Sequence, residues 1–354
     1  MLRPIKLRIK RARRNFDTTR RVGESAKTWM AIIVSVQKTE TLIMLPRTES
    51  YARRPFARRP LATRVDSHVH FYTAHDLQHV AGLLPYGLPE PHPIKVYLDK
   101  LIDAGITPSI INNVHLSILP DSQNVFASFD HLQTLQVANP QRYGGIQLAG
   151  TIHAQPSYAT QARLGHPQVI GARIVLHDAR PETVAESSFC DEQWQAFYAR
   201  LLPHQHLHIY AKEAQTNLRV LRQIPYRVPV LIDHLGSCHY ERGATEPAYS
   251  ALLAEAARRG NVGFKGPGYR TSVNPEQTAR FVTRIIRAVG AGNLLLEASD
   301  APHVGVGSNR VAYAEQFDVP RTFAFVEAVA RHVSKATAIP ASQLLRGACG
   351  QWLR

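Results

Sequence analysis

From Thr63 onward, short runs of β-branched and apolar residues alternate with longer stretches that have one polar face. This alternation is typical of parallel strands joined by crossover helices. Eight runs are predicted to be strands: residues 64–66, 109–114, 145–150, 171–176, 207–211, 228–233, 262–265 and 294–297. Between them, six stretches are predicted to be helices: residues 94–104, 124–138, 191–202, 214–223, 249–259 and 275–289.

Eight β/α units in about 290 residues predict a TIM (β/α)8 barrel, an α/β fold that needs roughly 250 residues. After the eighth strand, residues 302–319 are expected to form a long loop. Helices over residues 323–333 and 341–352 then close the barrel. We therefore predict a single barrel domain over residues 61–354.

The first 60 residues differ from the rest in charge. They contain 16 Lys and Arg against 4 Asp and Glu, whereas the remaining 294 residues contain 26 against 23. Most of the formal net charge of +15 therefore belongs to this segment. Clustered bases repel one another, so we predict a disordered basic extension over residues 1–60. A transit peptide, translation from an upstream start and a nucleic-acid-binding arm remain open explanations of it.

Membrane insertion and secretion are not indicated. No window approaches the roughly 18 uninterrupted apolar residues of a membrane span. Residues 30–36, the apolar stretch of the extension, precede no small-residue cleavage site. The three cysteines form no CxxC pair, so neither a disulfide framework nor a thiolate zinc site is expected. We predict a cytoplasmic protein.

Nearly every predicted strand ends in polar side chains. The carboxyl ends of TIM-barrel strands surround the active site, so these side chains are candidate functional residues. A single strand-end histidine is more often structural, but polar ends on so many strands favour a catalytic mouth. In chain order the candidates are His68, His70, Asn113, His115, Arg173, Tyr210, His234, Lys265, Arg270 and Asp300.

The pair of histidines on the first strand is the most informative of these. One residue separates His68 from His70, and side chains alternate along a strand, so both are expected to point into the barrel mouth. Two imidazoles placed in this way are suited to bind a metal ion or to stabilise an oxyanion.

Four later segments extend the pattern: HLHIYAKEAQ, RVPVLIDHLG, VGFKGPGYR and LLLEASDAPH. Together with the Asp-x-His-x-His sequence of the first strand, they resemble the amidohydrolase superfamily. Within it the chain is most similar to the amidohydrolase-related family and its 2-pyrone-4,6-dicarboxylate lactonase-like branch. The resemblance covers residues 63–354 and leaves out the basic extension.

The resemblance implies roles for most of the candidates. Two departures from the family pattern leave the substrate open: Asn113 stands in place of a serine, and a Gly-Pro-Gly segment before Arg270 changes the spacing. The implied catalytic residues are His68, His70, His234 and Asp300. The implied substrate contacts are Arg173, Tyr210, Asn113, His115 and Arg270, to which we add Lys265 as a further cation.

The metal content is left open by the sequence. Tyr210 stands where metal-dependent members usually have a histidine ligand, and a protonated tyrosine is a poor zinc ligand at neutral pH. The fourth strand contains Arg173 and no lysine that, once carbamylated, bridges two ions. The leading interpretation therefore requires no metal and no other cofactor. The alternative is a single Zn²⁺ or Mn²⁺ held by His68, His70 and Asp300.

The predicted reaction is hydrolysis of a lactone. Asp300 removes a proton from the attacking water, and His68, His70 and His234 stabilise the oxyanion. Arg173 and Arg270 favour a small-molecule substrate that bears carboxylates, because guanidinium groups bind carboxylates through paired hydrogen bonds. The alternatives are a metal-dependent decarboxylase of aromatic carboxylic acids, a sugar-acid lactonase and a nucleic-acid-binding protein.

Structural roles remain open for some of the same residues. Asp300 is a possible helix N-cap, and Tyr210 a possible packing residue. Arg173 has an internal ion pair with Glu213 or Asp233 as its structural alternative. The sequence identifies neither the individual lactone nor the oligomeric state.

Overall fold

The structure is a computed structural model that describes residues 34–36, 39–41, 64–81, 89–177, 179–303, 305–307 and 309–353. The predicted disorder of residues 1–60 lies outside the described residues, apart from two short strands in that range. These strands, β1 (Val34–Val36) and β2 (Thr39–Thr41), pair antiparallel. The domain boundary at residue 60 stays a prediction.

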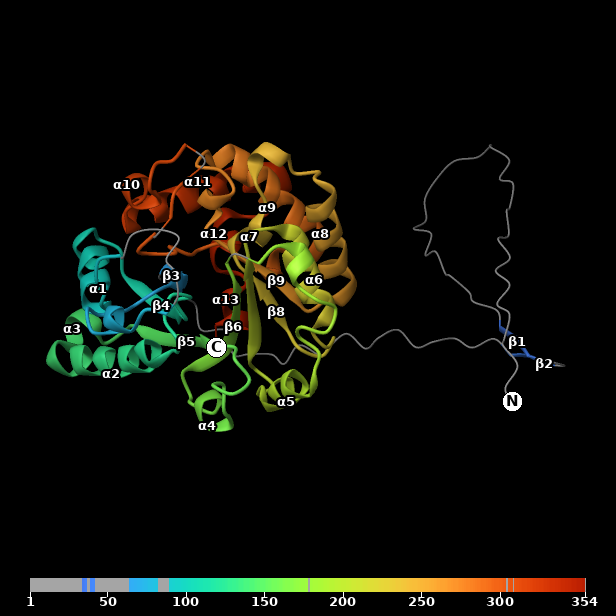
Figure 1. The fold of residues 1–354 in the computed structure, drawn as a ribbon. Helices are drawn as coiled ribbons and strands as arrows, with labels where there is room; N and C mark the ends of the chain where they lie inside the picture. The colour runs from blue at the N-terminus through green and yellow to red at the C-terminus, as the bar shows by residue number, and fades with distance from the viewer. Residues whose placement is uncertain are drawn as a thin grey trace. The chain divides into compact units, whose positions relative to one another are not determined.

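Eight parallel strands form one sheet whose spatial order is the chain order (Figure 1). Each strand predicted from the sequence is present within a few residues of its expected bounds, so the predicted TIM barrel is confirmed. The strands are β3 (Arg64–Val69), β4 (Pro108–Val114), β5 (Gln147–His153), β6 (Val169–Leu176), β7 (His206–Ala211), β8 (Val230–Ile232), β9 (Val262–Lys265) and β10 (Leu294–Leu295).

The ring closes between β3 and the chain that follows β10. The backbone N–H of Ser67 donates to the carbonyl of Glu297 over 3.0 Å, and that of His70 donates to the carbonyl of Ala301 over 2.9 Å. The buried Glu297 carboxylate also accepts a 2.8 Å hydrogen bond from Arg64. These contacts join the first and the last strand of the barrel.

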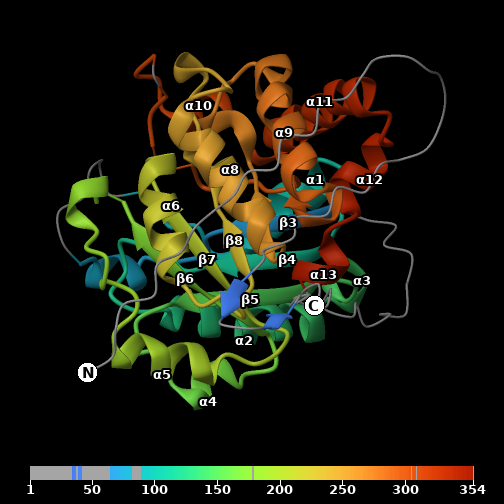
Figure 2. The same ribbon diagram turned by 90° about the vertical axis from the view of Figure 1, so that its right-hand side faces the viewer.

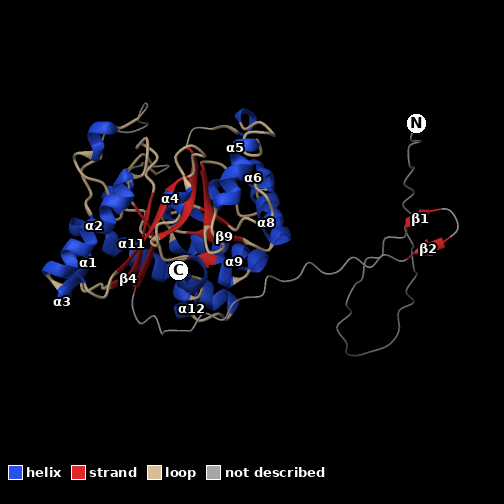
Figure 3. Cartoon of the chain, turned by 90° about the horizontal axis from the view of Figure 1, so that it is seen from below, coloured by secondary structure: helices blue, strands red, loops and turns tan. Residues whose placement is uncertain are grey.

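Helices surround the ring of strands, as the view from below shows (Figure 3). Successive long helices pack side by side: α6 (Ala214–Gln223) on α8 (Pro247–Arg259), α8 on α9 (Pro275–Val289) and α9 on α11 (Val319–Thr337) (Figure 2). Among the described residues, no helix is long and apolar enough to cross a membrane. The longer helices are α1 (Ile94–Asp103), α2 (Gln123–Ala138), α5 (Glu192–Arg200), α6 (Ala214–Gln223), α8 (Pro247–Arg259), α9 (Pro275–Val289) and α11 (Val319–Thr337).

Shorter helical segments complete the connections. The predicted closing helix over 341–352 is divided into two of them. Short α-helices are α3 (Pro140–Tyr143), α4 (Gln161–Leu164), α7 (His234–Ser237), α10 (Tyr313–Gln316), α12 (Ala341–Arg346) and α13 (Cys349–Trp352). The 3₁₀ turns are η1 (Asp76–His79), η2 (Pro181–Thr183), η3 (Tyr240–Arg242), η4 (Gly268–Arg270) and η5 (Ala291–Asn293).

Helix α9 shows how local sequence sets these elements. The Asn274 side chain accepts hydrogen bonds from the N–H groups of Glu276 and Gln277, which caps the helix start, and Pro275 occupies the first turn. Both features favour a helix N-terminus. The apolar residues of α9 recur at helical spacing and are buried. The predicted bounds of 275–289 are therefore confirmed.

Apolar side chains fill the bottom of the barrel interior. Trp352 of α13 packs among them and closes the amino-terminal end of the ring. The functional side chains therefore lie toward the opposite, carboxyl end of the strands. The strand residues of this floor are Val65, Ile110, Ala149, Ile170, Leu231 and Leu295.

Gly171 lies where β6 passes very close to β7. A Cβ at this position is only 2.1 Å from the backbone carbonyl oxygen of His206, its partner in the ladder. We expect Gly171→Ala to lower the free energy of unfolding by about 1–3 kcal/mol or more, because the strands must move apart. Urea denaturation followed by circular dichroism measures the loss.

Gly292 in η5 is the matched control for this substitution. No described residue lies within 4 Å of a Cβ built there, and its φ is not in the left-handed region. Gly292→Ala should change the free energy of unfolding by less than about 0.5 kcal/mol. Equal stabilities of the two variants would contradict the close approach of β6 and β7.

Candidate active site

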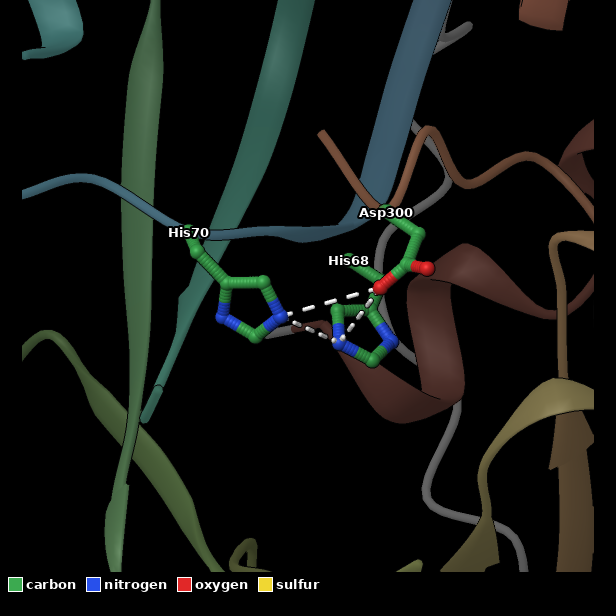
Figure 4. A group of neighbouring side chains, drawn as sticks. All are labelled: His68, His70 and Asp300. Atoms are coloured by element: carbon green, nitrogen blue, oxygen red, sulfur yellow. Dashed lines mark hydrogen bonds and ion pairs between the residues drawn. The ribbon is translucent and has the colours of Figure 1, made fainter. Parts of the chain in front are cut away.

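Three side chains predicted to act together meet in the barrel mouth. The Nε2 atoms of His68 and His70 are 3.2 Å apart. Oδ1 of Asp300 lies 3.6 Å from the first of these atoms and 3.7 Å from the second. Figure 4 shows the two imidazoles and the carboxylate pointing toward one another. All three residues are buried.

A bulge in β3 aims the two histidines inward. Asp66 pairs with Ile111 of β4 and Val69 pairs with Asn113, so β3 has one residue more than its partner over this interval. An extra residue in one strand changes which face the following side chains occupy. Val65, which lies before the bulge, faces the barrel floor. The extra residue reverses the alternation, so His68 and His70 also face the interior.

Barrel closure places Asp300 beside these histidines. Its backbone N–H donates to the carbonyl of His68 over 2.6 Å. Its φ is 54°, in the left-handed region, as are those of His234 (50°) and His303 (60°). Non-glycine residues in this region are uncommon and cluster at functional sites.

His234, at the end of β8, completes the catalytic group that was predicted. Its Nε2 atom lies 4.0 Å from Oδ1 of Asp300, and its ring stacks on His68 with centroids 5.1 Å apart. Tyr210 of β7 meets the His234 ring edge-on at 4.9 Å. The Arg173 guanidinium lies 5.4 Å from the centroid of the Tyr210 ring.

The second carboxylate oxygen of Asp300 is fully engaged. Oδ2 accepts hydrogen bonds from Nε of Arg270 at 2.8 Å, from Nη2 at 2.5 Å and from the Tyr269 hydroxyl at 3.0 Å. Burial by itself raises the pKa of Asp300, but the positive charge of Arg270 holds it well below its usual range. Asp300 is therefore ionised, with Oδ1 turned toward the histidines.

These contacts also settle the structural alternative for Asp300. Its carboxylate binds side chains and, among the described helices, caps none. Arg270 was predicted to bind a substrate carboxylate, and the structure places it on a carboxylate of the protein. Its side chain is still 23% exposed.

Beneath the mouth lies a buried network of charged groups. Nε of Arg173 is 2.8 Å from Oδ2 of Asp233. Nζ of Lys265 is 3.0 Å from Oδ1 of the same carboxylate and 2.9 Å from Nδ1 of His208. The internal ion pair with Asp233, foreseen as the structural alternative for Arg173, is thus present. Lys265 is completely buried below the mouth, and burial lowers its pKa to about 8 although Asp233 opposes the shift.

Two residues predicted to contact substrate at the end of β4 occupy different places. His115 stacks on His153 with centroids 4.4 Å apart, and its Nδ1 is 3.1 Å from the Ser122 hydroxyl. Burial holds the pKa of His115 well below its usual range, so its imidazole is neutral. Nδ2 of Asn113 donates to Ser128 of α2. Asn113 faces the helices because it is on the opposite face of the strand, so the structure does not bring it to the site.

Burial also keeps the candidate histidines of the site neutral. The pKa of His68 lies well below its usual range because of burial and of the positive charge on Lys265. Burial lowers the pKa of His70, although Asp300 works against this shift. Burial lowers the pKa of His234 to about 3. At neutral pH each imidazole therefore has one ring nitrogen with a free lone pair.

The neighbours of His70 show which of its nitrogens is protonated. Nδ1 lies 2.6 Å from the carbonyl oxygen of Val114, which only accepts hydrogen bonds. The proton of neutral His70 is thus on Nδ1, and Nε2 presents its lone pair to His68 and Asp300. This arrangement does not agree with the predicted role of His70 as an oxyanion donor, and it is the one that metal-binding histidines adopt.

The donor atoms fit a single divalent cation. Tetrahedral Zn²⁺ with bonds of about 2.0–2.2 Å holds its ligand atoms about 3.3–3.6 Å apart. The three separations among His68, His70 and Asp300 are 3.2, 3.6 and 3.7 Å. His68, Asp233 and His234 form a second group of donors, with atoms within 4.8 Å of one another.

Sequence analysis missed Tyr269. It stands in the segment VGFKGPGYR, from which Arg270 was selected for its charge. A tyrosine in a loop after a strand has no periodicity that separates a site residue from a packing residue. The adjacent arginine was the available signal, since residues next to a site residue often share its surroundings.

The fold and the site define a TIM-barrel enzyme of the hydrolase type. A family model described as Amidohydrolase matches residues 65–338. The chain therefore belongs to the amidohydrolase family, as its resemblance in sequence implied. A comparison with curated proteins found no match.

Solved structures share this fold. A probable 2-pyrone-4,6-dicarboxylic acid hydrolase from Acinetobacter baumannii, with citric acid bound, is 16% identical and covers 82% of this chain and 99% of its own, with a TM-score of 0.59. A proposed 2-pyrone-4,6-dicarboxylic acid hydrolase from Pseudomonas putida is 24% identical and covers 80% of this chain and 97% of its own, with a TM-score of 0.55. An amidohydrolase from Burkholderia multivorans, with bound zinc, is 16% identical and covers 82% of this chain and 99% of its own, with a TM-score of 0.56.

The donor geometry predicts that the purified protein binds about one equivalent of Zn²⁺. His70→Ala removes one of three donors and should weaken binding at least about 10-fold, measured by competition with a chromophoric chelator. His204→Ala changes an exposed histidine outside the cluster and should leave the affinity unaltered. Equal affinities of the two variants would contradict the assigned ligands.

Proposed function

We propose that this protein is a hydrolase that opens a carboxylate-bearing lactone, of the 2-pyrone-4,6-dicarboxylate type. One observation carries the proposal. Asp300 is an ionised carboxylate in the barrel mouth, with Oδ2 bound to Arg270 and Oδ1 directed at His68 and His70. This geometry supplies a fixed carboxylate oxygen at the place where the fold positions substrates.

In the proposed reaction, Oδ1 of Asp300 accepts a proton from the attacking water while the water oxygen bonds to the lactone carbonyl carbon. The ring C–O bond then breaks, and Asp300 returns the proton to the leaving oxygen. One water is consumed, and one carboxylate and one hydroxyl group are formed. Tyr210 and His234, which border the cluster, are the candidate donors to the oxyanion.

A divalent cation agrees with this arrangement. His68, His70 and Asp300 are the residues that would hold it. When bound, such an ion supplies a Lewis acid that polarises a carbonyl and lowers the pKa of water. A carboxylate whose pKa lies well below its usual range is a weak base toward free water, so the low pKa of Asp300 also favours a metal-assisted reaction.

The charges around the mouth support an anionic substrate. Arg173, Lys265 and Arg270 are three cations, and Asp233 and Asp300 are the two carboxylates that they contact. The neighbouring histidines are neutral, so this network carries one excess positive charge, which a substrate carboxylate compensates. The dicarboxylate lactone is also the substrate named for the Acinetobacter and Pseudomonas proteins of the same fold.

The proposal is tested by comparing a dicarboxylate with a neutral substrate. Protein with and without added Zn²⁺ is assayed on 2-pyrone-4,6-dicarboxylate and on a neutral sugar lactone. We expect kcat/KM to be at least about 10-fold higher for the dicarboxylate, because a charge-assisted hydrogen bond contributes roughly 1.5–3 kcal/mol. Release of CO₂ from an aromatic acid without lactone opening would favour a decarboxylase instead.

The same assay tests the role of Asp300. Asp300→Asn should lower kcat by about 10²–10⁴-fold, because the general base is lost. Asparagine tolerates the left-handed backbone conformation, so this variant should remain folded. Asp318→Asn is the matched control, because this exposed residue caps α11 and asparagine also caps helices well. Similar rates for both variants would remove Asp300 from the mechanism.

The pH dependence of the reaction should respond to Arg270. Its positive charge favours the ionised form of Asp300 and so lowers the pKa of that carboxylate. Arg270→Met should therefore raise the pKa, and the acid limb of the kcat/KM profile should move to higher pH by about 1–2 units. A profile that falls at the same pH in both proteins would show that Asp300 is not the titrating base.

A further inference from the structure

Tyr269 links the candidate base to a rigid part of the barrel. Its hydroxyl lies 3.0 Å from Oδ2 of Asp300 and 2.6 Å from Nδ1 of His303. Its ring is 1% exposed and stacks on Phe317, with centroids 4.7 Å apart and an interplanar angle of 20°. Tyr313 packs against it at 5.0 Å. A tyrosine confined in this way has little freedom to move its hydroxyl group.

The hydroxyl has one proton and three contacts, because it also lies 3.3 Å from the carbonyl oxygen of Ser299. Asp300 is an ionised carboxylate, the Ser299 carbonyl is a neutral acceptor at the longest distance, and His303 has a ring nitrogen that either donates or accepts. A charged oxygen is the stronger acceptor, and two unprotonated oxygens 3.0 Å apart in a buried site repel each other. The proton of Tyr269 therefore belongs on the side of Asp300. His303 must then donate from Nδ1 to the tyrosine oxygen.

The far side of His303 is consistent with this assignment. Its Nε2 atom lies 3.3 Å from the hydroxyl of Thr322, a completely buried residue of α11. The same hydroxyl lies 3.1 Å from the carbonyl oxygen of Asp318, so its single proton has two acceptors. With the proton of His303 on Nδ1, Nε2 accepts the Thr322 proton in place of the Asp318 carbonyl. The chain of hydrogen bonds thus runs from a long, well-packed helix, through His303 and Tyr269, to Asp300.

We infer that Tyr269 is a positioning residue that fixes the orientation of the Asp300 carboxylate, and that His303 fixes the orientation of Tyr269. A carboxylate rotates about its Cβ–Cγ bond, and this rotation exchanges Oδ1 with Oδ2. Tyr269 holds Oδ2 in place and keeps Oδ1 on the histidines. The inference rests on the proposed function, in which Oδ1 of Asp300 takes the proton from water.

Arg270 alone does not provide this restraint. It binds Oδ2 from a side chain that is 23% exposed, whereas Tyr269 belongs to a closed aromatic cluster. The two donors are neighbours in η4 that bind the same oxygen, and together they leave Oδ1 as the free oxygen. Reactive groups held by buried, hydrogen-bonded neighbours keep their productive geometry.

The first test uses Tyr269→Phe and a matched control, Tyr198→Phe. Tyr198 is also buried and also uses its hydroxyl in one hydrogen bond, to the carbonyl of Phe189, away from the cluster. ¹⁵N NMR distinguishes protonated from unprotonated ring nitrogens, and His303→Gln identifies the His303 signals. We expect the proton of His303 on Nδ1 in the unmodified protein and in Tyr198→Phe. In Tyr269→Phe it should move to Nε2, where Thr322 accepts it.

The second test is kinetic and structural. We expect Tyr269→Phe to lower kcat for the dicarboxylate lactone about 10–100-fold with KM changed less than about twofold, and Tyr198→Phe to change neither. A crystal structure of Tyr269→Phe should show the Asp300 carboxylate rotated or in two orientations. A kcat within twofold of the unmodified protein, an unmoved carboxylate, or a His303 proton on Nε2 before mutation would each overturn the inference.

Failure of the proposed function has a different outcome. In that case the unmodified protein opens neither lactone, whereas the NMR and crystallographic results do not depend on turnover. A change of the His303 proton together with a rotated Asp300 carboxylate then still supports the positioning role. The absence of both changes contradicts it.

Discussion

The hydrogen bonds that close the barrel are the same contacts that assemble the site. The N–H of Asp300 bonds to the carbonyl of His68, and the N–H of His70 bonds to the carbonyl of Ala301. The Asp300 carboxylate and the two imidazoles therefore come together only when the first strand pairs with the end of the eighth. Fold and site are not separable here, because a barrel left open between these strands also lacks the cluster of His68, His70 and Asp300.

The barrel interior changes from apolar to charged along its axis. Apolar side chains and Trp352 form the floor, the network of Arg173, Asp233 and Lys265 lies above it, and the histidine cluster occupies the mouth. Buried charges are costly unless they are paired and hydrogen-bonded, and each member of this network contacts an opposite charge. The network therefore supports the mouth from below while keeping one positive charge in excess, which an anion is suited to balance.

The sequence predicted the barrel because strand and helix periodicity are local properties. It also predicted that His68 and His70 share a face, since one residue separates them. It did not predict the bulge in β3, because a bulge depends on the pairing with β4 and not on β3 alone. Asn113 was misplaced for the same reason, since the face that a strand residue occupies is set by register. Tyr269 was missed because it contacts Asp300, which is 31 positions away in the sequence, and local patterns do not show such a contact.

Several residues at the mouth have left-handed backbone conformations. Some of these positions need glycine for the conformation, and others hold a side chain despite its strain. Gly236, in the turn after β8, has a φ of 85°, and a Cβ there meets Leu252 and Phe264 at 3.1 Å, so both conformation and space require glycine. His234 and Asp300 also have left-handed backbones, at a cost of roughly 1–2 kcal/mol each relative to the usual regions. Glycine at either position relieves that strain but removes the imidazole or the carboxylate. Side-chain chemistry therefore decides these two positions, which is the pattern expected of a catalytic mouth and not of a structural turn.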